Sequence, residues 1–431
     1  MFLWRFILSA QTVYLLFLLF FVSTTCGQLY LSIRQSKAVL AHRSRVPAAF
    51  LANVSLDEHQ KAADYTLAKQ RLARYEILFQ ALLLLVFTLG GGLDLLARLS
   101  QKWTHHDIVQ GILLIGLFAL VNMVLGWPLA WYRSFCLEAK FGFNKMTLAT
   151  FIADQFKGCL LAIIVGLPLL YIILLIMQIL IVANWFGGAW WLVVWLVWVS
   201  FSLLLMWAFP KWIAPLFNKF EPLQDDVMRA RIENLLQRTG FHSDGIFVMD
   251  GSKRSGHGNA YFTGLGKHKR IVFFDTLLKD MQVNEVEAVL AHELGHFAHK
   301  HVFKQMIVTF ILALIVFAVL GWLLPQAGFY LGLGVHEPSH AMALLLFMLV
   351  LPLFTFPFSP LASVLSRKNE FEADRFAAKY AHAEDLIQAL TKLYRSNAAS
   401  LVSDIWYSRF YDSHPGARER IAALQTAIKA H

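Results

Sequence analysis

Two histidines and a glutamate stand at the spacing that hydrolytic zinc sites use. His292 and His296 are four residues apart, and Glu293 directly follows the first histidine. Apolar residues recur at a helical period through residues 284–299, so both imidazoles fall on one helix face, one turn apart. This spacing suits two ligands of a tetrahedral zinc ion, with Glu293 as general base on a water at the metal. The motif predicts a hydrolase with one Zn²⁺ per chain.

Such a site needs a third protein ligand. One known pattern has a third histidine six residues after the second, but that position is Val302. His299 shares the helix face, yet it is too near along the helix to close a tetrahedron easily. Glu370 lies in a second helical pattern, and Asp374 follows one turn later. We predict that Glu370 is the third ligand and that Asp374 fixes the tautomer of a ligand histidine through a hydrogen bond.

The acidic stretch also has a simpler interpretation as a solvated helix face. Its three carboxylates would then pair with neighbouring basic residues. The acidic residues are Glu370, Glu372 and Asp374, and the basic ones are Arg367, Lys368 and Arg375. A zinc motif without a third ligand nearby favours the metal interpretation.

At the start of the helix with the zinc motif, Asn284 and Glu287 are spaced as a capping box, which predicts that this helix begins at Asn284.

Three short strand patterns precede the zinc motif, at residues 246–249, 259–263 and 270–274. Proteases commonly bind substrate as an added strand on an exposed sheet edge. Asn259 and Ala260 are therefore candidate substrate-binding residues beside the zinc. A supporting hairpin with no contact to substrate accounts for the same pattern.

Two further polar residues lie near the C-terminus. His414 precedes a proline, and Arg420 lies in the helical pattern that follows. Both are candidates to stabilise the oxyanion of a tetrahedral intermediate. A histidine at a helix start and a surface arginine are the alternative interpretation.

The composition places this chemistry at a membrane. The chain of 431 residues is 58% hydrophobic and only 15% charged, with a mean hydropathy of +0.55. Soluble proteins are about 45–50% apolar and about 25% charged, so a soluble globular, disordered or fibrous chain is excluded. The net charge of +10 indicates basic loops at a membrane surface rather than nucleic-acid binding. Three scattered cysteines support neither a disulfide framework nor a thiolate metal site.

Seven apolar segments are long enough to cross a bilayer. They are residues 4–26, 77–97, 109–131, 160–182, 185–209, 305–324 and 341–359. The first lacks a clean small-residue cleavage site, which favours a retained helix over a cleaved signal peptide. The sequence thus predicts a polytopic α-helical membrane protein whose seven spans carry a mostly helical cytoplasmic zinc-protease domain with a small β-sheet.

The basic residues set the orientation. Of 38 Lys and Arg residues, 35 fall in the four segments that share one side, which the positive-inside rule assigns to the cytoplasm, with the N-terminus outside. The expected organisation is five spans with basic cytoplasmic loops (1–209), a cytoplasmic metalloprotease region (210–304), spans six and seven (305–359) and a cytoplasmic tail with the third ligand (360–431). The expected membrane is a bacterial inner membrane, or alternatively that of the endoplasmic reticulum.

The motifs together resemble the type-I CAAX prenyl endopeptidases, seven-span zinc metalloproteases of the endoplasmic reticulum membrane, and their bacterial homologues. The matching segments, in the family's order, are 214–223, 252–255, 259–262, 269–278, 292–296, 370–374 and 414–415. The resemblance implies zinc at His292, His296 and Glu370, with Glu293 as catalytic base. It also implies that Asn259, His414 and Arg420 contact substrate. The spans would enclose a large water-filled chamber, and the substrate would be a membrane-associated peptide or protein, in eukaryotes cleaved after a prenylated cysteine.

Two other functions stay open at this point. A heat-shock-type membrane metalloprotease that clears misfolded proteins shares the motif but typically has fewer spans. A transporter or channel with a vestigial metal site usually carries ionisable residues within its spans. Here the spans are almost free of such residues, apart from Asp94 near a span end.

Overall fold

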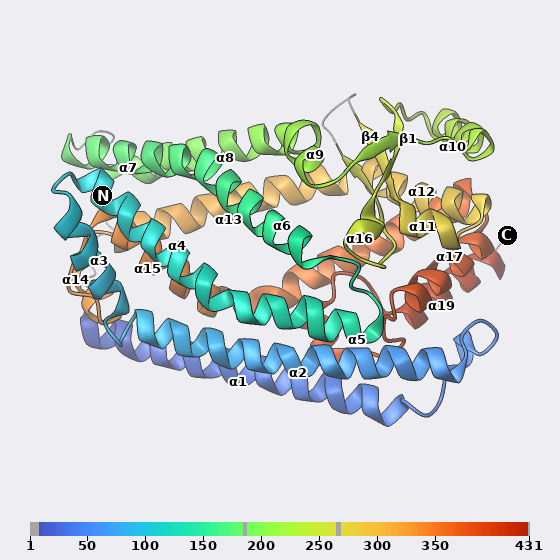
Figure 1. Cartoon of the computed structure of the whole chain (residues 1–431), viewed down its shortest axis with the longest axis horizontal. Helices are drawn as coiled ribbons and strands as arrows, with labels where there is room; N and C mark the ends of the chain where they lie inside the picture. Colours follow the sequence, from blue (N-terminus) through green and yellow to red (C-terminus); the bar gives the residue numbers. More distant parts are fainter. Residues whose placement is uncertain (1–7, 184–187, 264–268, 430–431) are drawn as a thin grey trace.

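The chain is almost entirely helical. The computed structural model describes residues 8–183, 188–263 and 269–429. Long helices extend to the left in Figure 1, and a smaller region with a sheet lies at the right-hand end. The helices are α1 (Ala10–His42), α2 (Leu56–Phe87), α3 (Gly92–Trp103), α4 (Asp107–Trp131), α5 (Ala139–Phe141), α6 (Leu148–Leu161), α7 (Leu167–Val182), α8 (Trp190–Ala208), α9 (Ala214–Phe217), α10 (Asp226–Thr239), α11 (Asp275–Asp280), α12 (Val283–Ala298), α13 (His301–Leu323), α14 (Ala327–Leu331), α15 (His340–Thr355), α16 (Ser359–Tyr380), α17 (Ala383–Ser396), α18 (Ile405–Tyr411) and α19 (Ala417–Lys429).

The membrane spans agree with the predicted number when one bent pair is counted as a single span. Within the described residues, six helical segments are long and apolar enough to cross a membrane, and α2 with α3 makes a seventh. The first span continues well past the predicted end, because α1 runs to His42. Residues 184–187 lie outside the described residues; they include the end of the short gap predicted between spans four and five and the first residues of the predicted fifth span.

The second predicted span, residues 77–97, is not one straight helix. The axes of α2 and α3 differ by 55°, and Gly91 between them has φ +75°, a left-handed conformation that glycine adopts without strain. Asp94 on α3 is buried, and its carboxylate accepts hydrogen bonds from the backbone N–H groups of His336 and Glu337. These bonds fix α3 against the segment that leads into α15.

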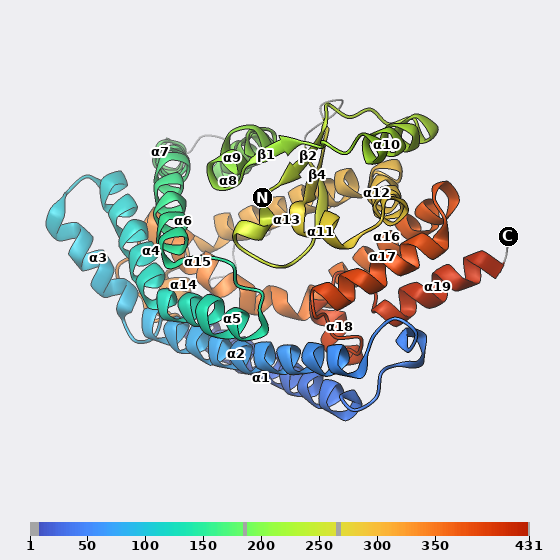
Figure 2. The ribbon, with the colours of Figure 1, turned by 45° about the vertical axis from the view of Figure 1, so that its right-hand side comes forward.

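The described residues form two main hydrophobic cores. One lies between the spans and contains Phe17, Leu93, Met177 and Leu320. The outward faces of the spans keep many large apolar side chains exposed, as expected for contact with lipid. The other core lies in the sheet-containing region and is built from α10, α12, α17 and β4. In Figures 1 and 2 α1 and α2 run side by side beneath both regions and so connect them.

The sheet has four described strands in the order β1-β2-β4-β3. The strands are β1 (Phe220–Pro222), β2 (Ile246–Met249), β3 (Ala260–Thr263) and β4 (Arg270–Phe274). β2 and β4 are parallel, whereas β3 pairs antiparallel with β4. The three predicted strands are confirmed and β1 is additional; residues 264–268, between the second and third predicted strands, lie outside the described residues. β3 occupies an edge of the sheet, which is the position predicted for substrate binding.

The start of α12 differs from the prediction. Gln282, rather than Asn284, caps the helix, and Glu285 completes the capping box. Asn284 instead donates a hydrogen bond to Asp385. Glu287 binds Arg231 and Arg238 of α10 at 2.6 and 2.5 Å. The predicted box was wrong because both side chains are used in contacts with other helices, which spacing cannot reveal.

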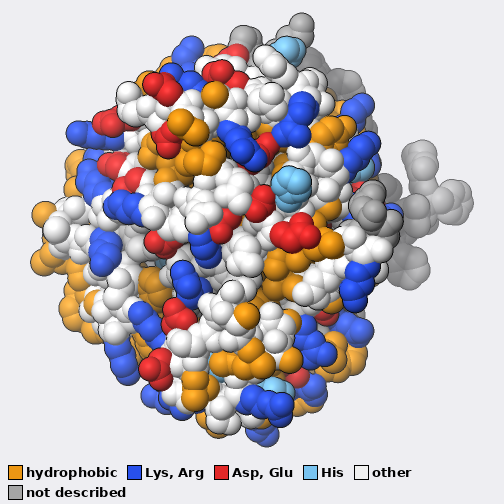
Figure 3. All heavy atoms as spheres, turned by 90° about the vertical axis from the view of Figure 1, so that its right-hand side faces the viewer, with side chains coloured by type: hydrophobic (Ala, Val, Ile, Leu, Met, Phe, Trp, Pro, Cys, Tyr) orange, Lys and Arg blue, Asp and Glu red, His pale blue; other side chains and the backbone are white. Residues whose placement is uncertain are grey.

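The region with the sheet is highly charged on its outer surface. Figure 3 looks onto the right-hand end of Figure 1, where α10, α17 and α19 lie, and basic and acidic side chains are spread across that face. The spans, in contrast, carry apolar windows with at most two charged residues. This end of the molecule is therefore suited to water, as the predicted zinc-protease domain requires.

Candidate active site

The site lies where α12 and α16 touch. A Cβ atom placed on Gly295 would lie 2.8 Å from the Cα atom of Ala373, closer than real Cβ contacts. The two backbones can approach this closely only because Gly295 has no side chain. The contact brings the histidines of α12 opposite the acidic residues of α16, although 60 residues separate the two helices in the sequence.

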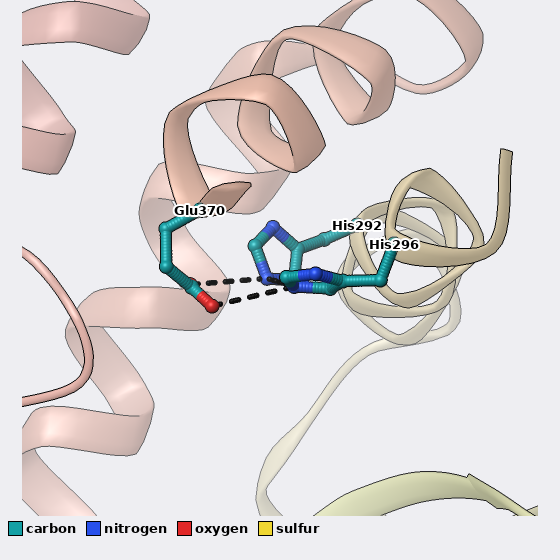
Figure 4. A group of neighbouring side chains, drawn as sticks. All are labelled: His292, His296 and Glu370. Atoms are coloured by element: carbon teal, nitrogen blue, oxygen red, sulfur yellow. Dashed lines mark hydrogen bonds and ion pairs between the residues drawn. The ribbon is translucent and has the colours of Figure 1, made fainter. Parts of the chain in front are cut away.

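His292, His296 and Glu370 converge on one point (Figure 4). The Nε2 atom of His292 lies 3.4 Å from Oε2 of Glu370, and the Nε2 atom of His296 lies 3.3 Å from Oε1. The two Nε2 atoms are 3.3 Å apart. One ligand atom from each residue lies within 4.8 Å of the other two. These three side chains could therefore share one metal ion, as the sequence predicts.

The chemistry of the three side chains fits a metal. Oε2 of Glu370 is buried and accepts no hydrogen bond from the described residues, although a buried polar atom is normally satisfied. Two imidazole nitrogens and one carboxylate are the ligands found in many hydrolytic zinc centres. A cation between them would satisfy the buried carboxylate.

Asp374 and Arg420 hold the first histidine. Oδ1 of Asp374 accepts a hydrogen bond from Nδ1 of His292 at 2.8 Å, which leaves the lone pair on Nε2 for a metal. Arg420 of α19 donates to both carboxylate oxygens of Asp374, at 2.9 and 2.5 Å. Burial tends to lower the pKa of Arg420, but the bond to Asp374 outweighs it and raises that pKa. Both side chains are buried, so the surface ion pairs of the alternative interpretation do not form here.

A cavity of about 160 Å³ opens beside these residues. Its lining contains six of the nine predicted site residues: Asn259, Ala260, His292, Glu293, His414 and Arg420. Burial raises the pKa of Glu293 above its usual range. A carboxylate with a raised pKa is better suited to act as a general base near neutral pH. The edge strand β3, the candidate base and one candidate metal ligand, His292, thus border one space.

His414 lies at the mouth of this cavity. Its Nε2 atom is 3.4 Å from Oε1 of Glu370, and its side chain is 59% exposed. Neighbouring protein atoms partly desolvate its imidazole and lower its pKa, so the neutral form is favoured. Nη1 of Arg420 lies 3.6 Å from Oε2 of Glu370. Both predicted oxyanion residues are therefore adjacent to the third ligand rather than at a free helix start or on the surface.

A further histidine supports the site and was not predicted from the sequence. His301 lies between His296 and Glu372, with Nδ1 3.1 Å from Nδ1 of His296 and Nε2 3.0 Å from Oε2 of Glu372. The five-residue spacing from His296 was a weak signal, because a histidine that follows a helix end has no fixed direction. His299, the other candidate ligand, is outside the metal cluster and stacks on His301.

Helices that span the membrane around a His-His-Glu centre, with a glutamate beside the first histidine, are those of a membrane metallopeptidase. Residues 35–219 match the family described as "CAAX prenyl protease N-terminal, five membrane helices", and residues 222–428 match "Peptidase family M48". The chain belongs to the CAAX prenyl protease family of membrane metalloendopeptidases.

Individual relatives match about three quarters of the chain or more. "CAAX prenyl protease 1" of Saccharomyces cerevisiae is 35% identical, over 74% of this chain and 72% of the yeast protein. The human protein named "CAAX prenyl protease 1 homolog" is 30% identical over 96% of this chain and 95% of its own length. The crystal structure of S. mikatae Ste24p superposes with a TM-score of 0.86 at 30% identity, covering 96% of this chain and 98% of that one.

Proposed function

We propose that this protein is a zinc metalloendopeptidase that cleaves prenylated, CAAX-type proteins near their C-termini. The observation that carries the proposal is the convergence of His292, His296 and Glu370, next to a cavity that His292, Glu293 and the start of an edge strand line. The names of the relatives supply the substrate class, since those proteins are CAAX prenyl proteases. A metal site with a vestigial role does not explain why the candidate base and the edge strand share this cavity.

The proposed zinc ligands are His292, His296 and Glu370. Bound zinc would supply Lewis-acid chemistry, which polarises the scissile carbonyl and makes water more acidic. Glu293 takes a proton from the attacking water and delivers it to the leaving amine. His414 donates a hydrogen bond to the oxyanion from the cavity mouth, and Arg420 supports it from the Nη1 side. Asp374 keeps His292 in the tautomer that ligation needs.

The substrate backbone is proposed to pair with β3. Asn259 and Ala260 lie at the start of this edge strand and line the cavity. Phe262 of β3 packs edge-to-face on Phe297 of α12, with ring centroids 5.1 Å apart. An added strand at this edge would place its peptide bonds alongside the ligand helix. Because β3 is packed against α12, the fold itself would determine which peptide bond of a paired substrate lies next to the metal site.

Larger cavities give the substrate room to enter. A cavity of about 670 Å³ shares His414 with the metal cavity. A further, more apolar one of about 530 Å³ shares Gln70, Tyr407 and Tyr411 with it. We propose that these spaces together form the water-filled chamber and that the lipid of the substrate lies in its apolar part.

The proposed orientation follows the basic residues. Segments 210–304 and 360–431 would lie in the cytoplasm as the metalloprotease region and the tail with the third ligand, while 1–209 and 305–359 hold five and two spans. In either membrane that the sequence allows, the bacterial inner membrane or the endoplasmic reticulum, the N-terminus is outside. Cysteine labelling at Ser396→Cys, accessible from the cytoplasm alone, tests this orientation.

The decisive experiment uses purified full-length protein in lipid nanodiscs with zinc. A farnesylated CAAX peptide and the same peptide without the lipid are incubated with wild type and with Glu293→Gln, and mass spectrometry identifies the products. We expect cleavage of the farnesylated peptide by wild type and a loss of about 10²–10⁴-fold in the variant, with zinc content unchanged. Equal cleavage of both peptides would support the quality-control protease instead.

A further inference from the structure

His301 connects a metal-ligand histidine to a second acidic residue. Its side chain is only 4% exposed and lies at the first residue of α13, the sixth span. Nδ1 of His301 is 3.1 Å from Nδ1 of His296, and Nε2 is 3.0 Å from Oε2 of Glu372. Glu372 stands on α16, two residues after Glu370. Three helices therefore meet around His296.

The order of these contacts determines where the protons lie. An ionised carboxylate only accepts, so the hydrogen bond to Glu372 must come from an N–H at Nε2 of His301. A neutral imidazole with its proton on Nε2 has a lone pair on Nδ1. His296 must then donate from its own Nδ1. Its remaining lone pair is on Nε2, the atom that faces Nε2 of His292 and Oε1 of Glu370.

A backbone feature brings His301 into this position. Lys300 has φ +55°, one of two described non-glycine residues with positive φ, and it separates α12 from α13. A left-handed residue costs of the order of 1 kcal/mol for a side chain such as lysine. Without this turn the chain would continue as one helix, and a residue five positions after His296 would point away from it.

We propose that His301 and Glu372 are positioning residues that hold His296 in the tautomer with its lone pair on Nε2, and so raise the affinity of the centre for zinc. This inference rests on the proposed metal site. Asp374 does the same for His292 with a single carboxylate. The two ligand histidines are thus oriented by separate supports, one direct and one through an intervening imidazole. If His301 and Glu372 only filled space, zinc affinity would not depend on whether the side chain at position 372 accepts or donates a hydrogen bond.

The test measures zinc affinity of the full-length protein by competition with a chelator, without any peptide. His301→Phe keeps a ring of similar size and removes the acceptor, and we expect zinc to bind about 10–100-fold more weakly. Glu372→Ala is expected to lose less, because His301 can still adopt the correct tautomer. Glu372→Lys is tolerable because the Glu372 side chain is 23% exposed. Lysine only donates hydrogen bonds, so it favours the tautomer of His301 that carries its proton on Nδ1. The loss of zinc affinity should therefore exceed that of Glu372→Ala.

Controls separate the possible failures. His299→Gln alters an exposed residue that stacks on His301 at 5.5 Å, and its zinc affinity should equal that of wild type. The melting temperature of each metal-free variant reports folding independently of zinc. If wild type binds no zinc, the proposed metal centre is wrong. If wild type binds zinc, and His301→Phe, Glu372→Ala and Glu372→Lys bind it as tightly as wild type does, the positioning role is wrong. Equal losses in Glu372→Ala and Glu372→Lys would also overturn it, even if His301→Phe does not fold.

Discussion

Arg420 on α19 holds Asp374 on α16 through two parallel hydrogen bonds, at 2.9 and 2.5 Å, and the same carboxylate accepts a hydrogen bond from His292. Three helices that are distant in the sequence are therefore joined by one chain of polar contacts that ends at His292, a proposed metal ligand. Arginine suits this position because its planar fork matches a carboxylate.

The first prediction concerns this fork. Arg420→Lys keeps the positive charge but cannot make two parallel bonds, so Asp374 and His292 lose their fixed orientation. We expect zinc to bind about 10–100-fold more weakly, as measured by chelator competition. Arg418→Lys, at an exposed position on the same helix, is the matched control. Unchanged affinity in Arg420→Lys would show that charge alone holds Asp374.

The second prediction tests the contact between α12 and α16. In Gly295→Ala the new Cβ meets the backbone of Ala373 at 2.8 Å, and backbone cannot move as a flexible side chain can. We expect a loss of about 1–3 kcal/mol in stability together with weaker zinc binding, measured by thermal unfolding with and without zinc. Gly158→Ala, where nothing lies within 4 Å, should not destabilise the protein. A Gly295→Ala variant as stable as wild type would contradict the close contact.

The third prediction concerns pH in the metal-free protein. Burial raises the pKa of Glu293 above its value in the unfolded chain, which is about 4.3. The neutral carboxyl therefore favours the fold below that pH, and this contribution is lost as the pH rises through the raised pKa. We expect Glu293→Gln to become more stable relative to wild type as the pH increases from 5 to about 8.

Melting temperatures of the two metal-free proteins across this range provide the measurement. Glu419→Gln, at an exposed position on α19, should show a difference from wild type that changes little with pH. A pH-independent difference for Glu293→Gln would mean that the carboxyl is not desolvated in the folded state.

The fourth prediction concerns the segment that leads into β3. Arg254 donates to both oxygens of Asp154 on α6, at 2.7 and 2.9 Å, and to Asn218 at 2.8 Å. Gly256 next to it donates a backbone hydrogen bond to Phe143. These contacts tie the start of the substrate edge to the membrane-spanning region.

Arg254→Ala should therefore raise the KM for peptide with zinc content unchanged, and should cost on the order of 2 kcal/mol in stability, since the pair is only partly buried. Arg395→Ala removes an exposed pair with Glu58 and serves as the control, with effects near zero. A KM equal to that of wild type would show that β3 keeps its place without this ion pair.

The cluster of His292, His296 and Glu370 could be predicted from the sequence because helix geometry places its members. His292 and His296 fall on one face at any position in the fold, and Glu370 and Asp374 do so on a second helix. That the two helices meet was inferred from the missing third ligand. The spans were predictable for a similar reason, since a bilayer demands long apolar segments.

Features that depend on tertiary contacts could not be predicted. The bend between α2 and α3 is formed at Gly91, yet glycine also occurs within straight spans. His301 joins the site only because Lys300 adopts a left-handed conformation, and no spacing rule specifies that turn. Glu372 could not be distinguished from a surface residue until its partner was known.

One further consequence concerns bilayer thickness. The seventh span and the α16 helix that carries Glu370 form one continuous helical segment, His340–Tyr380. A thinner or thicker bilayer changes the tilt of such a span through hydrophobic mismatch. Because the segment is continuous, a change of tilt in the membrane would displace the end that carries Glu370. Turnover should therefore vary with the acyl-chain length of the surrounding lipid, even for a soluble peptide that never touches the membrane.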